Sequence, residues 1–252
     1  MVSCVIFTRV VLSRITISVK QEKGTPMNVQ HQLIMFDLDG TLVETGMEIY
    51  AAVEDTLAQF AFAPVSREKV YGWIGRGSRE LLIQVLVFSL QRTDAQVRQH
   101  ERLAEIEVQF AQHYQRHSGT TGRLYPQVLG TLQALKARGI KLAVVTNKDT
   151  LNTGIVLQKH GLLALFDLVI AGDTLPTRKP DPAGITHCLH VFKIPASAAL
   201  FVGDSVIDAE AARNAGIQVW LLPYGYNMNQ PVQSAAPDRV IDSLAALLTD
   251  PH

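Results

Sequence analysis

The sequence predicts an α/β protein in which a doubly wound parallel sheet carries an inserted small helical cap domain. Over residues 121–252, short β-branched runs alternate with amphipathic stretches, a pattern typical of parallel strands connected by helices. Residues 46–120 instead show the three- and four-residue apolar spacing of helices. This helical stretch follows directly after the first apolar run, so it interrupts the alternation and is expected to form a separate cap.

The first strand of the sheet is expected at "LIMF", residues 33–36, where four apolar side chains precede an aspartate. The further strand-like runs are "IKLAVVT" (140–146), "FDLVIAG" (166–172), "ALFVGD" (199–204) and "IQVWLLP" (217–223), with helices expected near 127–138, 149–160, 182–192 and 205–215. Gly139, Gly161 and Gly216 fall where helices would end, because glycine readily adopts the left-handed conformation of a helix C-terminus. Strands this apolar imply helices on both faces of the sheet.

We therefore divide the chain into an N-terminal extension or tail at 1–30, a core of 31–45 and 121–252, and a helical cap of 46–120. In the cap, apolar residues recur at mostly helical steps, namely Met47, Ile49, Tyr50, Val53, Leu57 and Phe60. The first 20 residues lack acidic side chains, but Arg9 and Arg14 interrupt the apolar core that a secretory signal needs. We expect residues 1–26 to be an extension or a disordered tail, with Met27 as an alternative start.

The composition argues against two classes of partner. Lys plus Arg and Asp plus Glu each number 23, so the formal net charge is zero and nothing indicates nucleic acid or a membrane surface. The apolar fraction of 47% and the charged fraction of 18% are typical of a globular chain. Cys4 and Cys188 are too few for a disulfide framework, which favours a reducing compartment and a cytoplasmic location.

Polar residues follow the inner strands of the predicted sheet, at the point where each strand ends. They are Asp37 and Asp39, then Thr146, Asn147 and Lys148, then Lys179 in a loop, and finally Asp204 and Asp208. In open α/β sheets, ligands bind beyond the carboxyl ends of the strands. The sequence therefore predicts a functional site at this edge.

The aspartates at this edge predict a metal site. Carboxylates brought close together have raised pKa values unless a cation joins them, and carboxylate oxygens with room for water suit a hard Mg²⁺ ion. We expect Asp37 and Asp204 to bind Mg²⁺ directly and Asp39 to contribute its backbone carbonyl. Asp208 would contact the metal through a water molecule, or orient the residues that bind it.

The remaining residues suit phosphoryl transfer. Asp37, held beside Mg²⁺, can attack phosphorus and form an aspartyl-phosphate. Asp39 can protonate the leaving alkoxide and later deprotonate the attacking water. Thr146, with Asn147 beside it, and Lys179 would bind the phosphoryl oxygens. Gly40 would let backbone amides approach the phosphate closely.

Each of these motifs also has a structural explanation on its own. An Asp-x-Asp-Gly stretch commonly forms a turn, and "TNK" could lead into a helix capped by Asp149. "KPDP" could be a loop that opens a helix at 182, and Asp208 could simply complement a helix N-terminus. Together these explanations require independent coincidences at one edge of one sheet, so we favour the functional interpretation.

Two histidines, His113 and His117, stand at the i, i+4 spacing of zinc ligands on a helix. No glutamate follows His113, and the other histidines are scattered. We therefore expect an exposed helix face here and no zinc site.

Four motifs in order resemble the signature motifs of the haloacid dehalogenase-like hydrolases: "DLDGTL", "VVTNK", "KPDP" and "GDSVIDAEAARNAG". The resemblance runs from about residue 33 to the C-terminus. It implies a Rossmann-like core, a Mg²⁺ cofactor and the roles given above to Asp37, Asp39, Thr146, Lys179 and Asp204. The presence of Asp39 favours a phosphatase or phosphomutase in that family. Helices inserted after the first motif resemble the small cap type, which implies small metabolites as substrates.

Two further stretches, "GWIGRGSRELL" (72–82) and "LPYGYN" (222–227), resemble phosphoglycolate phosphatases, and "VET" departs from the usual Val-Asp-Ser. The resemblance implies hydrolysis of 2-phosphoglycolate to glycolate. Because phosphoglycolate carries a carboxylate besides its phosphate, the charged Arg76 of the glycine-rich cap loop is a candidate clamp for that end. The alternative is that Arg76 and Arg79 are solvated residues of the cap. The alternatives are a phosphatase for another small acidic sugar phosphate, a phosphomutase, and a non-enzymatic phospho-aspartate signalling or binding domain. The oligomeric state stays open.

Overall fold

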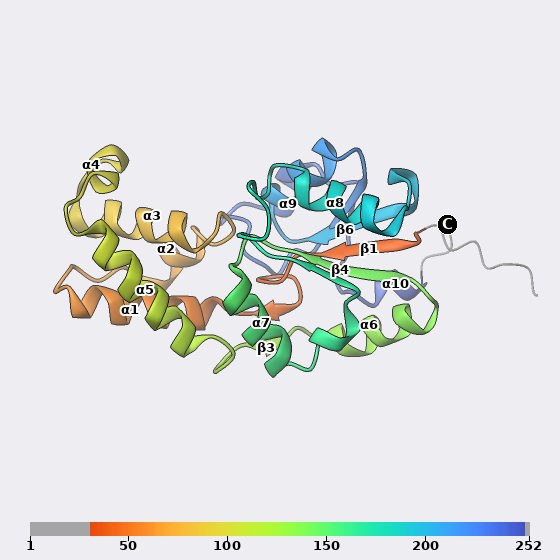
Figure 1. The fold of residues 1–252 in the computed structure, drawn as a ribbon, viewed down its shortest axis with the longest axis horizontal. Helices are drawn as coiled ribbons and strands as arrows, with labels where there is room; N and C mark the ends of the chain where they lie inside the picture. The colour runs from red at the N-terminus through yellow and green to blue at the C-terminus, as the bar shows by residue number, and fades with distance from the viewer. Residues whose placement is uncertain (1–30, 250–252) are drawn as a thin grey trace, which may run out of the picture.

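The computed structural model describes residues 31–249, so the prediction for residues 1–26 lies outside the described part of the chain. Its centre is a six-stranded parallel sheet in the order β5-β4-β1-β6-β7-β8 (Figure 1). The strands are β1 Leu33–Phe36, β4 Lys141–Val145, β5 Leu168–Ile170, β6 Ala199–Gly203, β7 Gln218–Leu221 and β8 Arg239–Val240. A small antiparallel pair, β2 Val43–Glu44 and β3 Arg123–Leu124, lies where the chain leaves and re-enters this core.

Helices cover both faces of the sheet, as the apolar strands predict (Figure 1). One face carries α6 Val128–Ala137, α7 Thr150–Lys159 and α10 Ala246–Thr249, and the other carries α8 Ala183–Phe192 and α9 Val206–Asn214. Short 3₁₀ turns occupy η1 Leu163–Leu165, η2 Ala196–Ala198 and η3 Val232–Ala235. Along β1, Ile34 and Phe36 pack toward the α6 side and Leu33 and Met35 toward the α8 side, because successive strand residues point to opposite faces.

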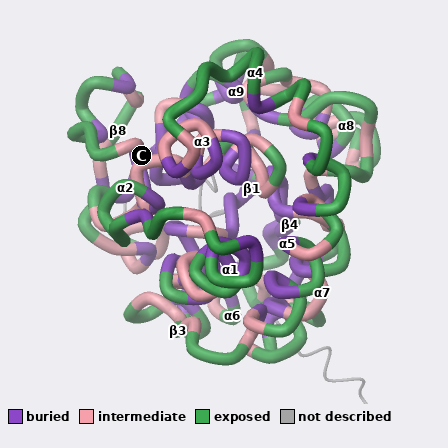
Figure 2. Tube along the Cα trace, turned by 90° about the vertical axis from the view of Figure 1, so that its left-hand side faces the viewer, coloured by how far each residue is buried: buried purple, intermediate pink, exposed green. Residues whose placement is uncertain are grey.

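The five helices of the inserted block are α1 Gly46–Gln59, α2 Arg67–Tyr71, α3 Ser78–Leu90, α4 Asp94–Arg98 and α5 Leu103–His117. They extend from the carboxyl edge of the sheet and pack around an apolar cluster of their own (Figure 1). Along α1, buried positions alternate with exposed ones, and along α3 they alternate mainly with half-buried ones, so each helix has an inward side (Figure 2). Tyr226, from the loop after β7, joins this cluster and connects it to the core.

The predicted fold class is confirmed. Each predicted strand contains an observed strand, and the ends of the two differ by two residues at most. Gly139, Gly161 and Gly216 follow helices with positive φ angles of 80°, 68° and 71°, as expected for helix ends. No helix among residues 31–249 is both long and apolar enough to cross a membrane. The boundaries of the two domains stay a prediction.

Leu132→Ala should lower the free energy of unfolding by about 2–5 kcal/mol, because it leaves a cavity in the core between α6 and the sheet. Leu132 is fully buried, whereas Leu129 on the same helix is 39% exposed. Leu129→Ala is therefore the matched control and should cost less than about 1 kcal/mol. Urea unfolding of both variants measures the difference, and equal losses would contradict this packing.

Candidate active site

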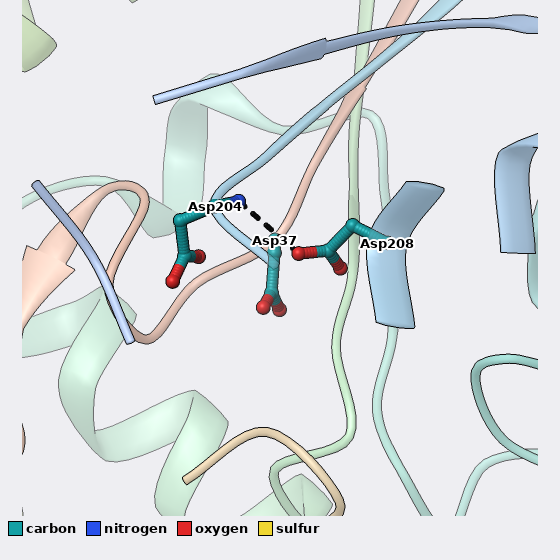
Figure 3. A group of neighbouring side chains, drawn as sticks. All are labelled: Asp37, Asp204 and Asp208. Atoms are coloured by element: carbon teal, nitrogen blue, oxygen red, sulfur yellow. Dashed lines mark hydrogen bonds between the residues drawn. The ribbon is translucent and has the colours of Figure 1, made fainter. Parts of the chain in front are cut away.

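Three aspartates meet at the carboxyl edge of the sheet. Asp37 directly follows β1, Asp204 directly follows β6, and Asp208 lies in the first turn of α9. One carboxylate oxygen from each lies within 4.8 Å of the others, and all three residues are buried. Figure 3 shows the side chains of Asp37 and Asp204 pointing to the same side, with Asp208 next to Asp37. The parallel order of β1 and β6 produces this convergence.

The electrostatics of the group follow from burial and crowding. Burial raises the pKa of Asp37 to about 6; the charges of Asp208 and Asp39 raise it too, whereas Lys179 lowers it. Burial, then the charges of Asp208 and Asp37, raises the pKa of Asp204. Removing carboxylates from water disfavours their charged form, and like charges add to this effect. The arrangement therefore stores unfavourable charge that a cation would relieve.

Asp204 is held by the loops on either side of it. Its Oδ1 accepts a hydrogen bond of 2.6 Å from the Thr41 hydroxyl, and its Oδ2 accepts one of 2.6 Å from the Tyr226 amide. The loops approach so closely that a Cβ at Gly40 or Gly225 would lie 2.5 Å or 2.2 Å from Asp204 Oδ2. Gly40 also has a φ of +85°, which a residue with a side chain rarely adopts.

Lys179 lies between two of the carboxylates. Its Nζ is 2.7 Å from Asp208 Oδ1 and 3.0 Å from Asp37 Oδ1. Burial alone would lower the pKa of Lys179, but Asp208 and Asp37 raise it above its ordinary value. This lysine therefore stays charged and fixed beside Asp37.

Both carboxylate oxygens of Asp208 have partners within the chain. Its Oδ1 accepts from Lys179, and its Oδ2 accepts from the amides of Asp204 and Ser205 and from the Ser205 hydroxyl. With Ser205, it forms the capping box of α9. The sequence suggested either a helix-capping residue or a neighbour of the metal ligands. Asp208 caps the helix and also lies next to the other two carboxylates.

Asp37 and Asp204 have the donor atoms that a divalent cation needs. Asp37 Oδ1 is buried, and its contact among residues 31–249 is the ion pair with Lys179 Nζ at 3.0 Å. Within the same residues, each oxygen of Asp204 accepts one hydrogen bond, so lone pairs remain. Two buried carboxylates that face each other with lone pairs left fit a hard cation such as Mg²⁺.

Asp39 lies on the other side of Asp37, toward the inserted helices. The Thr45 hydroxyl donates to its Oδ1 at 2.7 Å, and Lys148 Nζ lies 3.1 Å from Oδ1 and 3.3 Å from Oδ2. Lys148 also donates to the hydroxyl of Tyr114 on α5. A lysine buried in the core thus connects the second aspartate of the first motif to the inserted block.

Thr146 and Asn147 follow β4 and are buried with the other site residues. The Thr146 hydroxyl accepts from the Lys148 amide at 3.3 Å. Asn147 Nδ2 donates to the carbonyl oxygens of Gly75 and Lys179, both at 2.9 Å. Asn147 therefore joins the inserted block to the segment that carries Lys179, and the substrate-binding role expected for it stays a prediction.

A cavity of about 30 Å³ lies between the core and the inserted helices. Its lining consists of Asp37, Asp39, Ile49, Ile74, Gly75, Gly77, Ser78, Leu81, Phe110, Tyr114, Thr146, Asn147 and Lys148. The structure thus brings the predicted phosphoryl-transfer residues to one place. Arg76 is different, because its side chain is exposed and it does not line the cavity; its predicted carboxylate clamp stays untested.

Four residues at the site received no role from the sequence: Thr41, Tyr114, Lys148 and Tyr226. Lys148 belongs to the "TNK" motif, and its place among the polar residues at the strand ends indicates a residue of the site. Tyr114 kept helical spacing with Phe110, a signal for a core residue only.

His113 and His117 contact Asp55, with distances of 3.4 Å and 2.8 Å to its Oδ2. The expectation of an exposed face is wrong for His113, which is buried against α1 and bonded to Gln59. The only group of three or more candidate metal ligands found among the described residues is that of Asp37, Asp204 and Asp208.

The fold and the site define a class: α/β proteins with a carboxylate site at the edge of a doubly wound sheet, covered by a helical insertion. Residues 34–222 match the haloacid dehalogenase-like hydrolase family, and the chain belongs to this family. The relationship predicted from the four motifs is thereby confirmed.

Two relatives and one solved structure show which members of this family the chain is similar to. "Phosphoglycolate phosphatase 1" of Pseudomonas aeruginosa is 39% identical over 86% of this chain and 78% of its own length. A phosphoglycolate phosphatase of Haemophilus influenzae is 39% identical over 88% of this chain and 99% of its own. The crystal structure of a predicted phosphoglycolate phosphatase from Haemophilus somnus has a TM-score of 0.82 and 35% identity, and it covers 87% of this chain and 97% of its own.

Asp37→Asn should make the metal-free protein more stable near neutral pH. The pKa of Asp37 is raised from 3.8 to about 6 on folding, so the folded state binds the extra proton and stability falls as the pH rises from about 4 to about 6. The neutral variant avoids that loss, and we expect a gain of about 1–3 kcal/mol at about pH 7.5 that shrinks toward pH 4. Urea unfolding in EDTA at both pH values measures it. A variant less stable than the parent at the higher pH would contradict the prediction.

Proposed function

We propose that this chain is a Mg²⁺-dependent phosphatase that hydrolyses a small phosphate monoester, with 2-phosphoglycolate as the preferred substrate and glycolate as the product. The observation that carries the proposal is the pair of Asp37 and Asp39 at the sheet edge, each with its own buried lysine. The substrate class is supported by the names of the relatives at 39% identity. The partner is a small phosphorylated metabolite, without nucleic acid or membrane, and the location is the cytoplasm.

The metal in this proposal is held by this chain's own oxygen atoms. The carboxylates of Asp37 and Asp204 and the backbone carbonyl of Asp39 would bind Mg²⁺, with Asp208 behind them. When bound, Mg²⁺ supplies positive charge that stabilises the transferring phosphoryl oxygens. The convergence of the three buried carboxylates and the raised pKa values of Asp37 and Asp204 support this assignment.

In the first step, a carboxylate oxygen of Asp37 attacks phosphorus, and the bond between phosphorus and the ester oxygen breaks. Asp39 gives a proton to the leaving alkoxide, which departs as an alcohol. Lys179, fixed by Asp208 and Asp37, pairs with the phosphoryl oxygens, and the Thr146 hydroxyl donates to them. Close backbone approach at Gly40 places amide groups near the phosphate.

In the second step, water attacks phosphorus of the aspartyl-phosphate, and Asp39 takes the proton from that water. The bond between phosphorus and Asp37 breaks, inorganic phosphate leaves, and both aspartates return to their starting state. The inserted helices, residues 46–120, act as a cap that excludes bulk water during both steps.

Purified protein should hydrolyse 2-phosphoglycolate faster than the other members of a panel of phosphate monoesters. Activity should require Mg²⁺ and disappear in EDTA, because crowded carboxylates bind phosphate poorly without a cation. Phosphate release measures this, and the panel should include sugar phosphates of both acidic and neutral type. A preference for a larger sugar phosphate would leave the phosphatase assignment standing and overturn the substrate.

Asp37→Asn should lower kcat by at least about a thousandfold while the fold stays intact, because an amide cannot form the acyl-phosphate. The wild-type reaction in ¹⁸O-labelled water should place the label in the released phosphate. Transfer of the phosphoryl group to a second hydroxyl, with no label incorporated, would indicate a phosphomutase. Retained activity in Asp37→Asn would refute the nucleophile.

A further inference from the structure

We propose that Lys148 determines substrate specificity by binding a second anionic group of the substrate, a carboxylate one methylene group away from the ester oxygen. This inference rests on the proposed phosphatase function and deepens it. According to this inference, a core lysine beside the reacting groups selects phosphoglycolate-like substrates, and the exposed cap loop that carries Arg76 does not.

Lys148 is the only cation among the described residues that line the cavity. Its side chain is completely buried, with Asp39 on one side and the Tyr114 hydroxyl on the other. The ammonium nitrogen lies 3.1 Å and 3.3 Å from the two carboxylate oxygens of Asp39, and this close ion pair favours the charged form of the lysine. The cavity therefore holds a permanent positive charge apart from Lys179, which Asp37 and Asp208 already bind.

The position of Lys148 corresponds to the leaving-group side of the substrate. Asp39 must face the ester oxygen to protonate it, and Lys148 Nζ is 3.1 Å from Asp39 Oδ1. In phosphoglycolate, one methylene group separates the ester oxygen from the carboxylate. A carboxylate at that distance can replace Asp39 as the partner of the ammonium group, which also frees the oxygens of Asp39 to turn to the ester oxygen.

The surroundings of Lys148 favour a compact anion over a neutral group. Ile49, Leu81 and Phe110 line the cavity with apolar atoms, so hydroxyl groups of a larger sugar would find few partners there. The helix α3 begins at Gly77, which lines the same cavity and provides no side-chain cap, so the positive end of the helix dipole adds to the charge of Lys148. A site built to pair a buried ion rejects substrates that leave that ion unpaired.

Ethyl phosphate is the matched probe for this idea, because it has a methyl group where phosphoglycolate has its carboxylate. The test compares kcat/KM for the two esters in three proteins: wild type, Lys148→Met and Arg76→Met. Arg76→Met tests the competing carboxylate clamp, because it removes the exposed cation of the neighbouring cap loop. Thermal unfolding and circular dichroism check that each variant folds.

Wild type should prefer phosphoglycolate by at least about a hundredfold, since a buried charge pair contributes to discrimination by such factors. Lys148→Met should lower this preference by at least about thirtyfold, and Arg76→Met by less than about threefold. Lys148→Arg, which keeps the positive charge, should retain part of the preference. Tyr114→Phe keeps the ring and loses one hydrogen bond to the ammonium group, so it should lower the preference by a smaller factor than Lys148→Met.

Three outcomes would overturn the inference. If Lys148→Met lowers kcat/KM equally for both esters, Lys148 only positions Asp39 or stabilises the fold. A loss of preference in Arg76→Met alone would assign the carboxylate to the cap loop. A wild type without preference between the esters would remove the basis of the idea even if Lys148→Met fails to fold. The proposed function fails separately, and the inference with it, if wild type hydrolyses neither ester.

Discussion

The crowding of buried negative charge at the carboxyl ends of β1 and β6 is the constraint on which the rest of the site depends. Burial and the repulsion of neighbouring carboxylates raise the pKa values of Asp37 and Asp204, so their charged forms need compensation. The chain supplies Lys179, backbone amides and hydroxyl groups as partners. Asp37 Oδ1 has only the ion pair with Lys179 among the described residues, and a divalent cation is proposed to complete the compensation there.

The sheet order explains why partners from distant parts of the chain reach this point. β1 lies in the centre with β4 on one side and β6 on the other, so the three strand ends deliver Asp37, Thr146 and Asp204 to one edge. Gly40 and Gly225 then let two loops close on Asp204, since any side chain there would collide with it. The loop that carries Tyr226 also packs against the inserted helices, so the metal side of the site and the cap share a support.

The sequence allowed the fold and the sheet-edge residues to be predicted because both follow from local patterns. Strand periodicity locates each strand end, and the polar residue that follows it then belongs to the edge. Contacts across the cap could not be predicted in this way: Tyr114 reaches Lys148 only because α5 lies over the end of β4. The short elements β8 and α10 have too few residues for a periodic signal. His113 was misplaced for a related reason, since spacing along α5 does not reveal which side α1 covers.

The two buried lysines of the site differ in a way that fits different duties in the proposed reaction. Lys179 pairs with Asp37 and Asp208, and Asp208 is itself fixed by three donors at the start of α9, so the ammonium group is anchored. Lys148 pairs with Asp39, which must turn toward the ester oxygen, and with a hydroxyl on the cap. An anchored charge suits the phosphoryl group, which every substrate carries. Lys148 can instead bind the part of the substrate that differs between esters, because its partner Asp39 has to move during the reaction. Binding at Lys148 is complete only when a substrate carboxylate takes the place of Asp39.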